Sequence, residues 1–122
     1  MMAVSFSVMD GNGFLRIVST GLCEDLDQLK AYALAMHKVT ISSGQIRVLV
    51  DETGVAYRLG TVDDYNSGCF VSQLTPRPLK IAVLCSPEDW SNAKFWETVA
   101  VNRGVSVRVF RDQNSAEAWV RS

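Results

Sequence analysis

The chain has 122 residues, of which 48% are apolar and 20% charged, and its formal net charge is −1. This length and composition predict one soluble globular domain over residues 1–122, and the near-neutral charge argues against nucleic-acid binding. No apolar run approaches the roughly 18 residues of a membrane-spanning helix, so we expect a cytoplasmic protein without a transmembrane segment.

Two strands are predicted at the start of the chain. Val4, Phe6 and Val8 alternate with serines, which is typical of a half-buried strand. Residues 10–13 read Asp-Gly-Asn-Gly, a dense turn signal, and residues 14–20 form a second apolar stretch. The short gap between the two predicts an antiparallel hairpin.

A helix is expected over residues 24–40, after the hairpin. Acidic residues occupy its first turn and Lys38 lies near its end, which suits the helix dipole. Apolar residues recur at helical spacing and predict one buried face: Leu22, Leu26, Leu29, Ala33 and Met36.

The next stretch, residues 45–51, is predicted to be the central strand of the fold. It is short, rich in β-branched residues and apolar on both faces, as in the middle of a parallel sheet. We expect residues 52–60 to form a loop that exposes Tyr57 and Arg58. Residues 61–74 then fit a helix, with Thr61 as its N-cap and Asp64 as the partner three positions later.

Proline residues at 76 and 78 are expected to stop that helix, and residues 79–85 to form an inner strand. Ser86 and Pro87 are typical of a helix start, so a helix is predicted from residue 87 to about 103.

Residues 105–110 alternate as an edge strand does, and Asp112 or Ser115 is predicted to begin a final helix. The resulting order is ββαβαβαβα, an α/β fold with a five-stranded mixed sheet in the order 1-2-3-4-5. Only the first strand is expected to be antiparallel. Crossovers of one hand place the helices largely on one face, which leaves the other face open to a partner or a homodimer.

The opening hairpin and three later segments of this chain resemble the SpoIIAA-like family of bacterial proteins, relatives of the STAS domains. The later segments are IRVLVDETG at the central strand, PLKIAVL at the next strand, and VRVFRDQNSAEAWV at the end. The resemblance implies a STAS-like β-α superhelix and a regulatory module of the bacterial cytoplasm.

In STAS antagonists the switch is a phosphorylated serine in an Asp-Ser-Ser/Thr-Gly motif at the start of the helix after the central strand. Here residues 58–63 occupy that place, the motif is absent, and Thr61 is the hydroxyl that remains for phosphorylation. A phosphate there would suit the helix dipole, although Asp63 and Asp64 would oppose it. The alternative is that Thr61 serves only as a helix cap.

The carboxyl ends of parallel strands are where such sheets bind ligands. Asp51, Thr53 and Gly54 are expected there, beside Cys85 and Ser86 at the start of the next helix. A helix N-terminus can lower the pKa of a thiol, so an enzyme that uses Cys85 or Asp51 is one hypothesis. The alternative assigns structural roles to all of these residues.

No metal site or cofactor is predicted, because Cys23, Cys69 and Cys85 are scattered and His37 is the only histidine. We expect a non-enzymatic module that contacts a protein partner or a small ligand. The alternative function is a carrier of a small apolar or amphipathic, lipid-like ligand. The predicted ligand or partner surface comprises Asp51, Thr53, Gly54, Tyr57, Thr61, Ser86 and Trp90.

Overall fold

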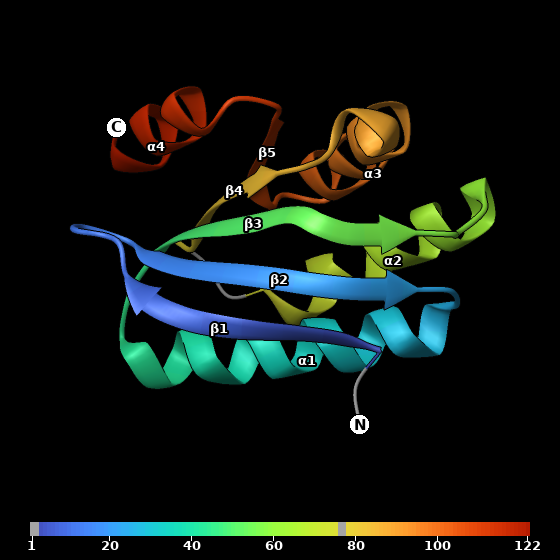
Figure 1. The fold of residues 1–122 in the computed structure, drawn as a ribbon, viewed down its shortest axis with the longest axis horizontal. Coiled ribbons are helices and arrows are strands. Elements are labelled where there is room, and N and C mark those ends of the chain that lie inside the picture. The colour runs from blue at the N-terminus through green and yellow to red at the C-terminus, as the bar shows by residue number, and fades with distance from the viewer. Residues whose placement is uncertain (1–2, 76–77) are drawn as a thin grey trace.

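The computed structural model describes residues 3–75 and 78–122, which form one α/β unit (Figure 1). Its elements in chain order are β1 (Val4–Asp10), β2 (Leu15–Cys23), α1 (Leu26–Ser43), β3 (Arg47–Tyr57), α2 (Thr61–Leu74), β4 (Lys80–Leu84), a 3₁₀ turn η1 (Pro87–Asp89), α3 (Trp90–Asn102), β5 (Ser106–Phe110) and α4 (Gln113–Arg121).

The five strands form one sheet in the order β1-β2-β3-β4-β5. β1 is antiparallel to β2, and the other neighbouring strands are parallel. The predicted fold class, strand order and N-terminal hairpin are therefore confirmed.

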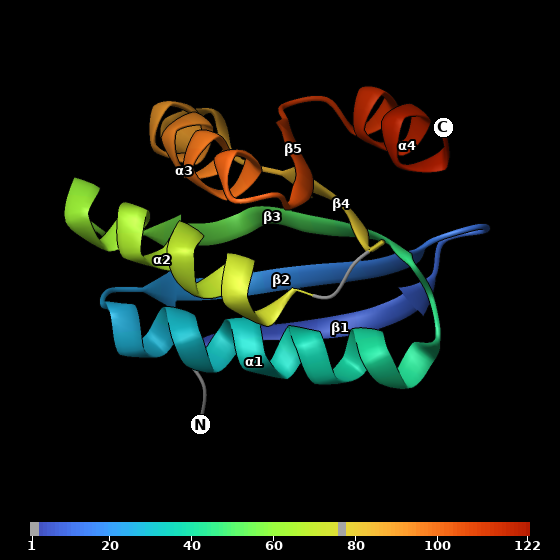
Figure 2. The ribbon, with the colours of Figure 1, turned by 180° about the vertical axis from the view of Figure 1, so that it is seen from behind.

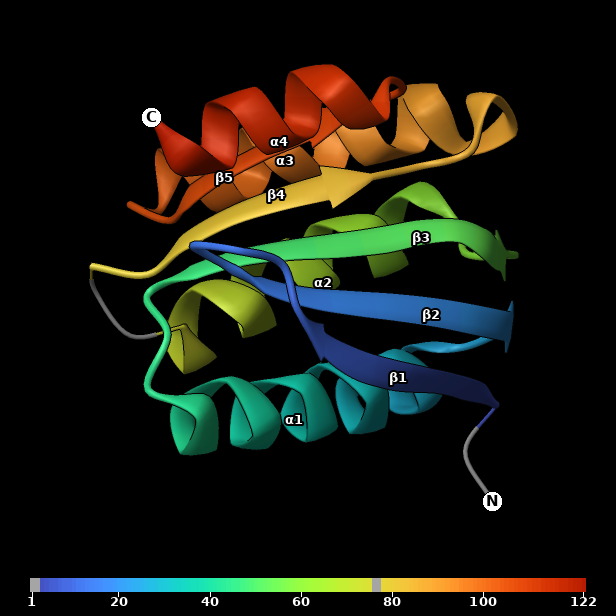
Figure 3. The same ribbon diagram turned by 60° about the vertical axis from the view of Figure 1, so that its left-hand side comes forward.

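The helices cover the two faces of the sheet unequally. Val48 and Val50 of β3 pack against Met36 of α1, whereas Leu49 packs against Val120 of α4. Since neighbouring side chains of a strand point to opposite faces, α1 and α4 lie on opposite sides. α1, α2 and α3 cover one face (Figure 2), and α4 covers β3, β4 and β5 on the other (Figure 3).

The open part of the second face lies over β1 and the later half of β2. Ser5, Ser7 and Thr20 are exposed there, and Figure 1 shows no helix in front of these strands. The prediction that helices lie largely on one face holds for α1, α2 and α3. α4 departs from it because no strand follows this helix, so the crossover rule does not restrain it.

The prediction that the central strand ends at Asp51 was wrong. β3 continues to Tyr57, so residues 52–57 of the expected loop are strand. β4 does end opposite Asp51, but β2 runs on and pairs with β3 as far as Cys23 opposite Tyr57. Residues 52–57 are less apolar than residues 46–50 because this part of β3 has β2 but not β4 beside it. Its pairing with β2 nevertheless keeps it a strand.

A bulge in β3 decides which side chains of this extension face the helices. Val18 pairs with Asp51 and Thr20 with Gly54, so Glu52 and Thr53 both lie opposite Ser19. The extra residue shifts the alternation by one position. As a result Glu52 and Tyr57, five residues apart, point to the same face.

Gly54 is required at this bulge because β2 approaches closely. A Cβ atom at residue 54 would lie 2.9 Å from Thr20 Cγ2 and 3.1 Å from the Ser19 carbonyl oxygen. Any other residue would push the two strands apart.

One predicted helix cap was wrong and two were confirmed. Gly60, not Thr61, is the N-cap of α2, and Thr61 is the first helical residue. Ser86 is the N-cap of η1, which begins at Pro87, although its hydroxyl donates to the carboxylate of Asp89 at 3.1 Å and not to the backbone. Asp112 caps α4 by accepting from the Ser115 backbone N–H at 2.9 Å. The proline at 76, predicted to stop α2, lies outside the described residues.

Candidate functional site

A cavity of about 160 Å³ lies between the sheet and helices α1, α2 and α3. The strands supply an apolar floor, and the helices supply apolar walls. Representative lining residues are Ile17, Met36, Val50, Val71, Ile81 and Trp96. The described part of the chain therefore forms a largely apolar pocket that is partly open to solvent.

Glu52 lines this cavity and forms its main polar feature. Its Oε2 atom lies 2.7 Å from the hydroxyl of Tyr32 and 2.8 Å from the hydroxyl of Tyr57. The Tyr32 hydroxyl is also 2.6 Å from Ser19 Oγ. A hydroxyl has one hydrogen, so when Tyr32 donates to Glu52 it accepts from Ser19. Two donors from α1 and β3 thus hold one carboxylate oxygen.

The other oxygen of Glu52, Oε1, accepts no hydrogen bond from the described residues. Among those residues, no fully buried side-chain oxygen or nitrogen lacks a partner. Oε1 therefore retains accessible surface, and Glu52 lines the cavity. The structure presents this oxygen to whatever occupies the space.

Two further carboxylates, those of Asp64 and Asp89, line the same cavity. Burial raises the pKa of Asp64 to about 6, with additional repulsion from Asp63 and Asp89. Burial also raises the pKa of Asp89, against the opposing hydrogen bond from Ser86. For Glu52, burial raises the pKa more than the bonds from Tyr32 and Tyr57 lower it.

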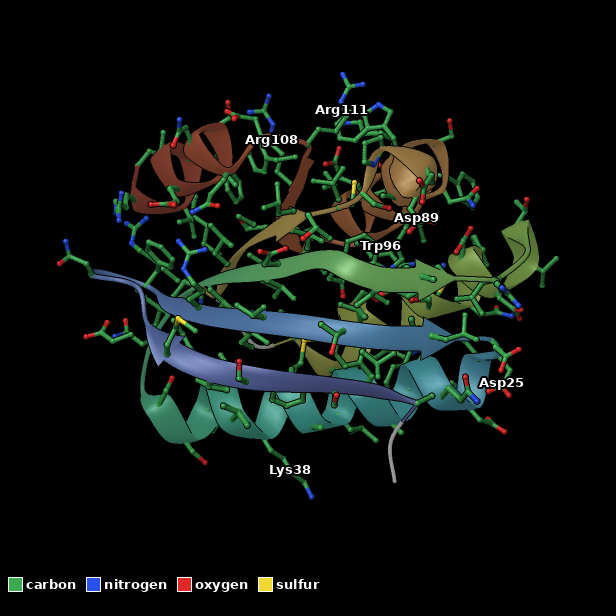
Figure 4. All side chains as sticks on the ribbon, in the orientation of Figure 1. Asp25, Lys38, Asp89, Trp96, Arg108 and Arg111 are labelled. Atoms are coloured by element: carbon green, nitrogen blue, oxygen red, sulfur yellow. The ribbon has the colours of Figure 1, made fainter. Side chains whose placement is uncertain are left out.

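No basic side chain of the described residues forms an ion pair with these three acids. The ion pairs that do form join Arg16 and Arg121 to Glu117, and Lys94 to Glu97. In Figure 4, Asp89 and Trp96 lie where α3 passes close to β3. Arg108 and Arg111 extend outward, and Lys38 points away from α1. This end of the cavity is therefore negatively charged when its acids are ionised.

The structure brings only part of the predicted surface to the cavity. Tyr57 was expected to be exposed, but it is half-buried and bonded to Glu52. Asp51 points to the opposite face and accepts from the backbone N–H and hydroxyl of Thr53, at 3.0 and 2.7 Å. Asp51, Thr53 and Gly54 thus lie at the bulge and do not line the cavity, and their role in a ligand or partner surface stays a prediction.

The other predicted residues lie around the start of α3 and α2. Ser86 reaches the cavity only through its bond to Asp89. Trp90 packs on the β5 side and stacks under Arg111, whose guanidinium carbon is 4.3 Å from the ring centroid. Thr61 is exposed at the start of α2.

Sequence reasoning missed Glu52 and Tyr32 and misassigned Asp64. Tyr32 sits between Leu29 and Ala33 on the predicted apolar stripe, so helical spacing alone could have found it. Glu52 was placed in a loop, and Asp64 was interpreted as a capping partner of Thr61. Finding Glu52 required the extension of β3, and finding Asp64 required the position of α2 against the sheet.

The hypothesis of an activated Cys85 was wrong in its physical premise. Cys85 is buried, and burial next to Glu52 and Asp89 raises its pKa to about 11. His37 also lines the cavity. It lies five residues along α1 from Tyr32, which is about 7.5 Å of helix, so it does not join the Tyr32–Glu52 hydrogen-bond group. Within residues 3–75 and 78–122, no group of three or more His, Cys, Asp or Glu is placed to hold a metal ion.

Alkylation of the native protein tests this conclusion. Cys23 has the same elevated pKa, about 11, because of burial and the nearby Glu52. We expect iodoacetamide at pH 7.5 to leave Cys23 and Cys85 at least tenfold less modified than Cys69, which is partly exposed. Peptide mass spectrometry measures this, with urea-unfolded protein as the control. Rapid native labelling of Cys85 would revive the nucleophile hypothesis.

No protein-family model matches the chain, and no curated protein matches it in sequence. Two solved structures have the same fold. An anti-sigma factor antagonist from Mycobacterium paratuberculosis superposes with a TM-score of 0.69 at 13% identity, over 98% of this chain and 95% of that one. An uncharacterised protein from Shewanella loihica with a SpoIIAA-like fold gives 0.55, with the same identity and coverages.

These comparisons confirm the expected resemblance at the level of the fold: the chain has the SpoIIAA-like architecture. None of the helices in the described ranges combines the length and apolar character needed to cross a membrane.

Proposed function

We propose that this chain is a non-enzymatic regulatory module of a bacterial cytoplasm that acts through contacts with a protein partner. The anti-sigma factor antagonist fold, shared over 98% of the chain, supports a regulatory role. The buried, poorly ionised Cys85 and the absence of a histidine relay among the described residues make a catalytic role the weaker reading.

The observation that carries this proposal is the exposed apolar start of α2. Val62 is 72% exposed and Tyr65 is 44% exposed. Both follow Thr61, in the region where the family resemblance places the regulatory switch. An apolar side chain this exposed, next to an aromatic one, is typical of a surface that a partner covers. We define Thr61, Val62 and Tyr65 as the α2 surface.

Phosphorylation of Thr61 would act on this surface directly. The Thr61 side chain is exposed at a helix N-terminus, where the helix dipole favours a phosphate and Asp63 and Asp64 oppose it. A phosphate there would place a charge beside Val62 and weaken an apolar contact. This switch remains a prediction, as does a homodimer through the open face of β1 and β2.

Comparative capture from a lysate of the source cells tests the α2 surface. We expect the wild-type chain and Val101→Ser to retain the same partner, and Val62→Ser to lose it at least tenfold. Val101 is a matched control because it is 47% exposed on α3. Quantitative mass spectrometry of the captured proteins gives the ratio. Equal capture by all three forms would count against the α2 surface.

The cavity favours a second candidate function, the binding of a small amphipathic ligand. Its walls are largely apolar, and its polar groups include the three acids Glu52, Asp64 and Asp89. Ligand pockets usually combine these two features. Thr61, Val62 and Tyr65 do not line the cavity, so the two candidate functions use different side chains.

A further inference from the structure

Asp64 is a buried acid without a hydrogen-bonding or ionic partner for its carboxylate in the described part of the chain. The residue is 9% exposed, and its carboxylate oxygens keep some accessible surface, because no fully buried side-chain oxygen among the described residues lacks a hydrogen bond. Burying a carboxylate is costly unless the group is paired. Asp64 lines the cavity, so the missing partner has room to bind there.

The second oxygen of Glu52 offers an independent indication of the same ligand. Tyr32 and Tyr57 fix the carboxylate through Oε2 and leave Oε1 free toward the cavity. This arrangement orients an acceptor and provides no donor to Oε1. The chemistry that completes it is an N–H donor, and a cationic one forms the strongest bond to a carboxylate.

The volume of the cavity sets how much of a ligand it can cover. An apolar cavity of about 150 Å³ holds a benzene molecule, and this cavity measures about 160 Å³. Six to eight non-hydrogen atoms therefore fit. The apolar side chains of Val50, Val71 and Ile81 would surround the uncharged part of such a molecule.

We propose that the cavity binds a small amphipathic amine, with its ammonium group bonded to Glu52 and attracted by the nearby charges of Asp64 and Asp89, and with its hydrocarbon part against the sheet. The proposal rests on the ligand-binding candidate function and not on the α2 surface. A metal ion does not fit, because no three such side chains among the described residues are placed to coordinate one.

The charge of the site discriminates between amphipathic ligands. A fatty acid would bring a fourth carboxylate to Glu52, Asp64 and Asp89, and like charges repel strongly in a buried site. An alcohol can donate one hydrogen bond but leaves the acids uncompensated. An ammonium group provides up to three donors and a positive charge, so it satisfies more of the site than either.

Calorimetric titration of the purified full chain at pH 7.5 tests the proposal with four probes. These are n-hexylammonium, 1-hexanol, hexanoate and methylammonium, which vary the head group and the chain separately. We expect n-hexylammonium to bind at least tenfold more tightly than 1-hexanol, with no measurable binding of hexanoate or methylammonium.

Two isosteric variants locate the head group. Asp64→Asn and Glu52→Gln should each weaken n-hexylammonium about 10- to 100-fold and change 1-hexanol by less than about threefold. Glu24→Gln, on an exposed side chain outside the cavity, should change neither. Circular dichroism of each variant checks that it is folded.

The outcomes separate the proposals. If 1-hexanol binds as tightly as n-hexylammonium, or if the variants leave the n-hexylammonium affinity unchanged, the amine assignment is overturned and ligand binding stands. If none of the probes binds, both the amine assignment and the ligand-binding function are overturned. The protein-contact function is unaffected by any of these results.

Discussion

Replacing Leu49 with alanine should lower the free energy of unfolding by about 3 to 4 kcal/mol. Leu49 is fully buried at the centre of β3, where it packs against Phe14 just before β2, Ala82 of β4 and Val120 of α4. Alanine would leave a cavity among four elements that are fixed by the sheet and cannot close around it. Urea unfolding followed by far-ultraviolet circular dichroism measures the loss.

Ile46→Ala is the matched control for this experiment. Ile46 lies just before β3 and is 54% exposed, so its truncation should cost about 0.5 kcal/mol. The difference between the two variants reports the double burial of β3, between α1 and α4. A Leu49→Ala cost near that of Ile46→Ala would mean that α4 does not cover this strand in solution.

Replacing Asp64 with asparagine should stabilise the protein by about 1 kcal/mol at pH 8 and by little at pH 4, because solvent that reaches the carboxylate screens part of the effect of burial. The pKa of Asp64 is raised from 3.8 to about 6 in the folded chain, mainly by burial. Between these values the folded state holds the proton more tightly than the unfolded state does. The contribution of Asp64 to stability is therefore present below about pH 4 and is lost as the pH rises through 6.

Urea unfolding of both proteins at several pH values between 4 and 8 measures this effect. The free energy of unfolding of the variant should exceed that of the wild type by an amount that grows across this pH window and then levels off. The control is Glu24→Gln, which alters an exposed acid and should shift the curve by less than about 0.5 kcal/mol at any pH. A pH-independent difference, or a loss of stability in Asp64→Asn, would show that Asp64 is compensated in the folded state.

The expected gain in stability of Asp64→Asn also tests whether Asp64 belongs to a binding site. A residue that lowers stability at neutral pH, and that a neutral isostere would improve, is typical of a binding site rather than a scaffold. Asp64→Asn should thus be more stable and bind n-hexylammonium less tightly. A purely structural role cannot produce both changes together.

The fold followed largely from local patterns in the sequence. The alternation of Val4, Phe6 and Val8 and the turn at residues 10–13 predict the hairpin. The apolar runs at residues 45–51 and 79–85 predict the two inner strands. Alternating strands and helices then restrict the topology to the observed order, because crossover connections have one hand.

The site followed from features that no local pattern carries. β3 extends to Tyr57 because β2 continues beside it, and that pairing joins residues more than 30 positions apart. The bulge at Glu52 and Thr53 is a one-residue change in the pairing of β3 with β2 on either side of Ser19. Neither feature changes the composition or periodicity of the chain around it.

The sequence by itself determined the strands, helices and their order, because burial on one or both faces imposes a readable period on the residues. Only the tertiary structure decided that Glu52, Tyr32, Tyr57 and Asp64 share one cavity. The physical reason is that a one-residue shift in strand pairing reverses the direction of every later side chain, and that shift is set by neighbouring strands.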